Sequence, residues 1–366
     1  MSWSLLLADL AGVTKGEINN AGSRTLSFPF NRLWTGSFRV RLDHPLAPDL
    51  LAGDSLIKVY QQTSISTTPA LRMVAEIVSV EEVASESDPG SLAVTFAEAG
   101  FWRLSHRLIG KSAAGYSQGT ALAPVVRGSI ASNVISTVNA ERDTGVRIGT
   151  IADTATGYVG PWYYKPVSEA ITELSATLDG FDFRFDPIEP ATDAAGLAVS
   201  RFRTAGAIGQ TRANTVFEFG TGKRNIKNLK RQVSRDGLLT RGFHLPPGFP
   251  ETSDPVVSSE NTPAIAARGL HEALVTSDIT VADLRAALVR EHVTIRKQPR
   301  QIITFEPTSY GSEFFADYEV GDVVTARARV GNSTRFNALF RIYGVDVTIN
   351  DTGLATYSLT LINSET

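Results

Sequence analysis

The sequence contains no cysteine among its 366 residues. This absence excludes disulfide bonds, thiolate metal sites and cysteine nucleophiles at once. The chain also has no apolar run that approaches the roughly 18 residues of a membrane-spanning helix. At the N-terminus no basic segment precedes the apolar residues, and Asp9 interrupts them early. We therefore expect neither a secretory signal peptide nor a membrane anchor.

Motifs for catalysis and metal binding are also scarce. The five histidines are scattered, with no pair at the spacing of metal ligands, and no Gly-x-Ser-x-Gly motif occurs. Asp179, Asp182 and Asp186 lack the order of a calcium-binding loop, and the segment after Gly220 lacks the first glycine of a phosphate-binding loop. We predict no catalytic residue, no cofactor and no bound metal, and therefore a protein that is not an enzyme. An undetected hydrolase is the remaining enzymatic alternative.

Length and composition describe a globular protein with more than one domain. A chain of 366 residues is too long for one comfortable hydrophobic core. Apolar residues make up 42% and charged residues 20% of the chain, which is not the composition of a disordered or membrane protein. The net charge of -3 argues against a dedicated nucleic-acid-binding protein. The 30 glycines and 17 prolines indicate the frequent turns of a β-rich fold.

The C-terminal stretch from Tyr318 to Leu361 reads as a small antiparallel sheet. A turn at Gly321-Asp322 precedes three β-rich runs. In the first run apolar and polar residues alternate, which is the period of a half-buried strand. Asn350 to Gly353 separates the last two runs, and its residues suit a hairpin turn because they tolerate positive φ.

The same plan occurs earlier in the chain, between Leu50 and Phe96. Gly53-Asp54 again precedes three strand-like runs, and a further strand precedes each copy, at Phe38–Leu42 and at Gln301–Phe305. Self-similarity of this kind indicates an internal duplication. The alternative is a chance likeness between two hairpin sheets, since little beyond the Gly-Asp pairs is identical. We assign structural turns to Gly53, Asp54, Gly321 and Asp322.

Changes in composition divide the chain into four segments. We expect residues 1–110 to form an N-terminal β domain and residues 111–243 an α+β middle domain. Residues 244–262 are rich in proline and serine and read as a linker, and residues 263–366 read as a helix followed by a second β domain. The predicted fold class is α+β and dominated by β structure, with two related antiparallel β domains that flank the middle domain.

One charge feature rises above the balanced background. Six basic residues precede the first acid, Asp236, and they are Lys223, Arg224, Lys227, Lys230, Arg231 and Arg235. One interpretation places this basic run on a passage for DNA or against an acidic neighbour. The other is a solvated face or a face paired with another subunit, and the small net charge favours it.

Several patterns together resemble a known family. They are Trp3-Ser-Leu-Leu-Leu-Ala-Asp-Leu-Ala-Gly, Leu51-Ala-Gly-Asp-Ser-Leu-Ile-Lys-Val-Tyr, Gly180-Phe-Asp-Phe-Arg-Phe and Phe340-Arg-Ile-Tyr-Gly-Val. In these patterns the chain resembles the baseplate hub, or tail-associated minor tail, proteins of siphoviruses that infect actinobacteria. The likeness covers nearly the whole chain, although each motif is only a pattern of strands and turns.

The resemblance implies a structural protein of the virion tail tip. Members of the family form a ring of three subunits, and each subunit carries two tube-like β domains, so that the homotrimer presents a pseudo-sixfold face to the tail tube. The implied partners are the distal tail protein ring, the tape measure protein, other minor tail or fibre proteins and, transiently, the passing DNA. In such a ring we expect the basic run at subunit contacts or on the outer face, because many phosphate contacts would retard DNA.

The alternative function is a glycan- or receptor-binding β module of the tail tip. Trp34, Trp102, Trp162, Tyr163 and Tyr164 are its candidate stacking platforms. Packing in the core or at an interface is the competing interpretation of these aromatic residues. A ring of three chains would favour the hub, and glycan binding by a monomer would favour the module.

Overall fold

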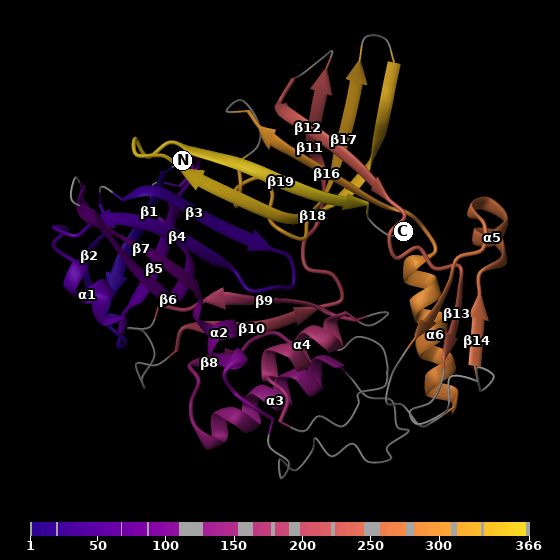
Figure 1. The fold of residues 1–366 in the computed structure, drawn as a ribbon, viewed down its shortest axis with the longest axis horizontal. Coiled ribbons are helices and arrows are strands. Elements are labelled where there is room, and N and C mark those ends of the chain that lie inside the picture. The colour runs from indigo at the N-terminus through magenta and orange to yellow at the C-terminus, as the bar shows by residue number, and fades with distance from the viewer. Residues whose placement is uncertain are drawn as a thin grey trace.

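The computed structural model of the chain describes most of its residues. They are residues 2–19, 21–66, 68–85, 88–109, 127–152, 164–176, 180–189, 198–220, 224–244, 257–275, 282–308, 313–330 and 333–363. β-strands dominate, and most of them belong to one large sheet that is mainly antiparallel (Figure 1). The predicted fold class is confirmed.

The large sheet has 13 strands drawn from both ends of the chain. From the N-terminal half come β1 (Ser2–Ala8), β2 (Thr14–Glu17), β3 (Gly22–Pro29), β4 (Thr35–Arg41), β5 (Leu56–Gln62), β6 (Ala70–Ser85) and β7 (Asp88–Glu98). From the C-terminal half come β11 (Thr211–Gly220), β12 (Ile226–Ser234), β16 (Arg300–Pro307), β17 (Val323–Val330), β18 (Ser333–Ile349) and β19 (Ala355–Asn363).

Two sets of six strands in this sheet share one topology. In the N-terminal β unit (β1, β3, β4, β5, β6 and β7) the spatial order is β3-β4-β7-β6-β5-β1. In the C-terminal β unit (β11, β12, β16, β17, β18 and β19) it is β12-β16-β19-β18-β17-β11. Numbered along the chain, both orders are 2-3-6-5-4-1. The predicted internal repeat is therefore confirmed in strand order, with one difference: β1 runs antiparallel to β5, whereas β11 runs parallel to β17.

Irregularities in the pairing recur at matching places in the two units. The register breaks between Gly22 and Thr25 where β3 meets β4, and between Lys227 and Lys230 where β12 meets β16. Inside these breaks Ser23 has φ 47° and Asn228 has φ 55°, a conformation that few residues other than glycine adopt. The hairpins β6–β7 and β18–β19 carry a bulged residue at matching places, Val78 and Tyr343, and β6–β7 has a second irregularity between Val83 and Ser85. Recurrence of such costly details argues strongly against chance likeness.

The two units join edge to edge. The second half of β18 pairs antiparallel with β3, so that Val345 lies opposite Phe28 and Val347 lies opposite Leu26. One hydrophobic core then serves both units, and the indole nitrogen of Trp3 donates to the Tyr357 hydroxyl within it at 2.9 Å. The two sheets expected from the sequence are one continuous sheet, because pairing covers strand edges that would otherwise be exposed.

The middle of the chain forms a smaller α+β layer with its own core. It contains α2 (Ala99–Ser105), α3 (Arg127–Glu141), α4 (Val167–Ser175) and the sheet β8-β10-β9, with β8 at Val146–Ile148, β9 at Asp182–Pro187 and β10 at Ser200–Ala205. The sides of α3 and α4 that carry Val134 and Ile171 pack with Phe183 and Phe202 of the sheet. The helices lie on one side of these strands, below the large sheet in Figure 1. Leu104 and Ile109 also pack here, although they lie within the segment predicted as the first β domain.

A third, small layer is inserted in the C-terminal β unit between β12 and β16. It holds α5 (Thr262–Arg268), α6 (Ala282–Arg296) and the sheet β14-β13-β15, with β13 at Arg241–His244, β14 at Val257–Glu260 and β15 at Glu272–Val275. Val289 and Val293 of α6 pack on Leu239 and Val275. The segment predicted as a linker thus contains a strand and the start of a helix, while its residues 245–256 lie outside the described part. The remaining helix, α1 (Ala47–Ala52), precedes β5.

Candidate assembly surfaces

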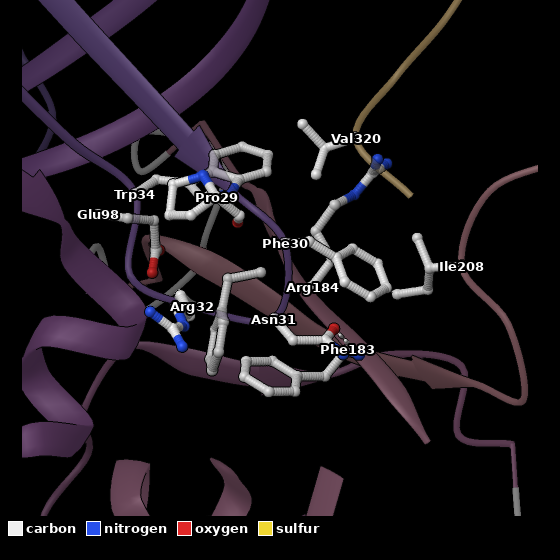
Figure 2. A pocket seen from close by; sticks show the side chains of 11 residues that line it. Pro29, Phe30, Asn31, Arg32, Trp34, Glu98, Phe183, Arg184, Ile208 and Val320 are labelled. Atoms are coloured by element: carbon white, nitrogen blue, oxygen red, sulfur yellow. Dashed lines mark hydrogen bonds between the residues drawn. The ribbon is translucent and has the colours of Figure 1, made fainter. Parts of the chain in front are cut away.

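A small cavity lies where the two β units meet the middle layer. Figure 2 shows Phe30 and Trp34 facing Phe183 across it, with Ile208 and Val320 at one side. Its volume is about 20 Å³, which holds about one water molecule. Such a cavity has no room for a substrate. Among the described residues, no group of three or more His, Asp or Glu side chains is placed to hold a metal ion.

Glu98 is the most perturbed carboxyl group at this junction. It caps the N-terminus of α2, where its two oxygens accept hydrogen bonds from the backbone N–H groups of Gly100 and Phe101 at 2.8 and 2.7 Å. Burial raises its pKa to about 7, and these two hydrogen bonds oppose the rise. The carboxyl group is 4% exposed and occupied with capping, so we assign it a structural role.

Two residues of β9, Asp182 and Arg184, tie the middle layer to its surroundings. The carboxylate of Asp182 in β9 accepts hydrogen bonds from the Asn31 side chain at 3.1 Å, the Ile208 backbone at 2.8 Å and the Arg341 guanidinium at 2.8 Å. Arg184, also in β9, pairs with Glu319 at 2.6 Å. The contacts of Asn31, Arg341 and Glu319 join the middle layer to the segments of the two β units. In the sequence Asp182 is recognisable only as part of a weak acidic cluster. Its role could not be predicted, because its partners lie more than 20 residues away along the chain.

The four predicted turn residues lie in two different settings. Gly53 has φ 74° and ends α1 with open space around it, and Asp54 is exposed. Gly321 has φ 96°, and a Cβ atom there would lie 2.6 Å from the carbonyl oxygen of Ile208. Asp322 is 1% exposed and accepts hydrogen bonds from the Gln210 backbone, the Glu319 backbone and Arg212. The two Gly-Asp pairs also differ by one residue in their distance from the following strand, since β5 begins at Leu56 and β17 at Val323.

Lys227, Lys230 and Arg231 of the basic run lie on β12, at one end of the large sheet, and Arg224 and Arg235 flank this strand. Lys227 pairs with Glu306 at 3.2 Å, and Arg231 donates to the Gln301 side chain at 3.0 Å. Lys230, Arg231 and Arg235 are exposed. Arg224 donates to the carbonyl oxygen of Gly220 just before the strand, and Lys223 lies outside the described residues. The run therefore follows an outer sheet edge and forms no enclosed pocket within the described part of the chain.

An acidic sheet edge was missed by the sequence reasoning. The second half of β6 carries Glu81 and Glu82, both exposed, beside the exposed Val83. In the described part of the chain this half pairs with β7 on one side, while β5 pairs only with the first half, up to Glu76. The available signal was a pair of adjacent acids on a strand, but the sequence alone does not show that β6 extends beyond its neighbour β5.

One face of the large sheet carries a row of hydroxyl groups. Register places one Ser or Thr opposite the next across six neighbouring strands, in the order Ser79, Thr95, Ser37, Thr25, Thr348 and Thr356. We call this set the hydroxyl row. Its members are exposed or half-buried, and Thr25 and Ser37 are hydrogen-bonded at 2.7 Å. A groove of about 510 Å³ lies over part of it.

The aromatic residues proposed as stacking platforms do not gather on one surface in the described structure. Trp34 is buried and donates to the carbonyl oxygen of Pro29, so it packs in the core. Trp102 lies at the rim of the groove over the hydroxyl row and contacts His106. Tyr164 is exposed, while Trp162 and Tyr163 lie outside the described residues. Among the helices that the structure describes, none is long and apolar enough to cross a bilayer.

Comparisons with known proteins connect this architecture to phage tails. No sequence family model and no curated protein matches the chain. The tail protein from Neisseria meningitidis MC58 matches in structure with a TM-score of 0.61 at 11% identity, covering 100% of this chain and 97% of that one. The 43 kDa tail protein of prophage MuSo2 from Shewanella oneidensis has a TM-score of 0.59 at 10% identity, covering 99% and 98%.

A third solved structure agrees with these two. Prophage tail protein gp18 from Listeria monocytogenes EGD-e matches with a TM-score of 0.55 at 12% identity, covering 99% of this chain and 94% of that one. Each match extends over nearly the whole of both chains. The chain therefore has the fold of prophage tail proteins, and at these identities the likeness establishes the fold alone.

Proposed function

We propose that the protein is a structural hub of a phage tail tip, in which three copies form a ring that joins the tail tube to the tip and lets DNA pass. The observation that carries this proposal is the repeat: two β units of one strand order lie side by side in a single sheet. The whole-length likeness to prophage tail proteins supports the setting. We place the protein in the virion, at the tail tip.

The repeat gives the proposed ring its symmetry. Two similar units in each of three chains present six similar surfaces around one axis, which suits a sixfold tail-tube ring on one side and a threefold tip on the other. The partners in this proposal are a distal tail protein ring, a tape measure protein and other minor tail or fibre proteins. Within one chain the β3–β18 contact already shows how one unit adjoins the next.

The hydroxyl row is our candidate for the wall of the bore. Duplex DNA binds tightly where many Lys and Arg side chains reach its phosphates, and such contacts would retard its passage. Ser and Thr hydroxyl groups keep a wall hydrated without attracting phosphate in this way. On the same face Asp346, which accepts a hydrogen bond from Ser27, adds negative charge, while Arg39, Lys227 and Lys230 add positive charge. A wall of this kind suits transient contact with moving DNA.

The native mass of the purified chain tests this proposal. We expect a species of three chains by native mass spectrometry or light scattering, and rings with a central hole by negative-stain electron microscopy. A stable assembly of two or four chains would contradict the hub, as would a monomer that binds glycans on an array.

A further inference from the structure

The contact between the two units inside one chain is a template for a contact between chains. Strand β3 is the second strand of the N-terminal β unit, and its outer edge pairs with the second half of β18, the fifth strand of the C-terminal β unit. Val345 lies opposite Phe28, Val347 lies opposite Leu26, and the Ser27 hydroxyl donates to Asp346 at 2.6 Å.

The corresponding edges at the other ends of the two units are open. The second strand of the C-terminal β unit is β12, and it pairs only with β16 in the described part of the chain. The fifth strand of the N-terminal β unit is β6, whose second half, from Ile77 onward, pairs only with β7 there. Each open edge is the counterpart of an edge that the β3–β18 contact covers.

Shared irregularities fix the correspondence residue by residue. Ser23 and Asn228 are the positive-φ residues at the matching register breaks of β3 and β12. Counting from them, Leu26 corresponds to Arg231 and Phe28 to Val233. The bulged residue of β6 matches that of β18, and counting from these bulges Val80 corresponds to Val345 and Glu82 to Val347.

We infer that β12 of one copy pairs antiparallel with the second half of β6 of the next copy, in the register of the β3–β18 contact. This register places Val233 opposite Val80, Arg231 opposite Glu82 and Gln232 opposite Glu81. One valine then faces another, the basic side chain faces an acid, and the amide of Gln232 faces a carboxylate to which it can donate a hydrogen bond. The register follows from backbone irregularities alone, so the complementarity of these side chains supports the contact independently.

The exposed state of these edges also favours pairing with a second copy. Val233 is 52% exposed and Val83 is 41% exposed, both on strands whose open edges offer unpaired backbone groups. Such edges invite pairing with another chain, and charged residues restrict which chain fits. A basic edge and an acidic edge repel their own kind, since like charges directly opposite destabilise a strand pair. The contact is therefore head-to-tail, as a closed ring requires.

The inference rests on the proposed trimer, and the resulting geometry suits it. Eight strands of each chain (β12, β16, β19, β18, β3, β4, β7 and β6) would then run in one continuous wall. With strands about 4.8 Å apart and tilted by about 40°, three chains make a backbone circle about 50 Å across. The hydroxyl row lies on one face of this wall.

Disulfide trapping tests the register, and the absence of native cysteine makes it clean. The variant Val80→Cys/Val233→Cys places two thiols opposite each other across the proposed contact. Residues directly opposite in an antiparallel pair have Cα atoms about 4.5–5.5 Å apart, within the range that a disulfide spans. We expect diamide oxidation of the full chain to give covalent dimers and trimers on non-reducing gels, with no longer species, because the ring closes at three.

Two controls make the result specific. Each single variant can form at most one symmetric disulfide and should stay near the monomer position. Val80→Cys/Lys230→Cys shifts one thiol by three residues, roughly 10 Å along the strand, and should cross-link at least tenfold less. A second variant pair tests charge: Arg231→Glu should weaken self-association by at least tenfold, and Glu82→Arg in the same chain should restore most of it.

The outcomes separate this inference from the proposed function. A native trimer whose Val80→Cys/Val233→Cys variant does not cross-link, or cross-links no better than the shifted control, overturns the β6–β12 contact and leaves the hub proposal standing. A ladder that continues past three chains also overturns it, because it shows an open chain of copies. A chain that is monomeric in native mass measurements and forms no cross-link contradicts both proposals.

Discussion

The N-terminal and C-terminal β units share one strand order but treat the same edge differently. On β3 the positions that face β18 carry Leu26 and Phe28, which are buried in the common core. On β12 the corresponding positions carry Arg231 and Val233, which are exposed. A permanent contact within the chain thus uses apolar residues, whereas the edge left open uses charge. An edge that must stay soluble until its partner arrives has reason to be charged.

Removing a side chain from each edge gives the largest expected contrast. Phe28 is fully buried, and its ring centroid lies 5.0 Å from that of Trp34. We expect Phe28→Ala to lower the free energy of unfolding by about 3–5 kcal/mol, because it leaves a cavity. Val233→Ala, at a protein concentration that keeps the chain monomeric, should change it by less than about 0.5 kcal/mol. Urea denaturation of both variants measures this, and equal losses would remove the distinction between the two edges.

The pH dependence of stability should also distinguish the two units, because only one of them carries an ionisable group at the end of its last strand. Glu98 ends β7, while its counterpart at the end of β19 is Asn363, which has no charge and accepts a hydrogen bond from the Gln301 backbone. The pKa of Glu98 in the folded chain is about 7, above its ordinary value of 4.5, so folding favours the protonated form. Its contribution to stability is therefore complete below about pH 4.5 and is lost as the pH rises to about 7, by up to roughly 3 kcal/mol.

The substitution Glu98→Gln tests whether Glu98 causes the predicted loss of stability as the pH rises. The variant keeps an oxygen for the α2 cap and cannot ionise, so its free energy of unfolding should lack the fall between pH 4.5 and 7. Urea denaturation at half-unit pH intervals measures both curves. A fall of the same size in the variant would show that another group carries the pH dependence.

The two turn glycines provide the smallest contrast. Both have positive φ, but only Gly321 has a carbonyl oxygen within 3 Å of the place where a Cβ atom would stand. Gly321→Val should therefore cost about 3 kcal/mol, and Gly53→Val only about 1–2 kcal/mol from backbone strain. Thermal or urea unfolding of both variants decides this. An equal cost at the two positions would contradict the difference in packing.

The sequence was informative wherever local pattern controls structure. Alternating residues located β17, and the order of runs revealed the repeat, because strand period and turn chemistry are local properties. The identical Gly-Asp pairs marked the right region of each unit. They do not occupy equivalent positions, however, because Asp54 lies two residues before β5 and Asp322 lies one residue before β17. The local structure also differs, since α1 precedes β5 while a buried turn precedes β17.

Pairing between distant segments could not be predicted in this way. The β3–β18 contact joins Leu26 to Val347, and neither strand carries a signal that names the other. The sequence shows the basic run as a cluster of positive charge. The partner that we propose for it, the acidic edge at Glu81 and Glu82, becomes visible only from the order of strands in the sheet. The predicted linker contains β14 because β13 offers it an edge, which is a tertiary effect.

A structure of the assembled tail tip tests the central claim most directly. Cryo-electron microscopy of the ring should show three copies, with β12 of each copy hydrogen-bonded to β6 of the next and with Arg231 within salt-bridge distance of Glu82. The hydroxyl row should face the bore. Any other stoichiometry, or a ring in which Arg231 lines the narrowest part of the bore and the hydroxyl row faces outward, would contradict this account.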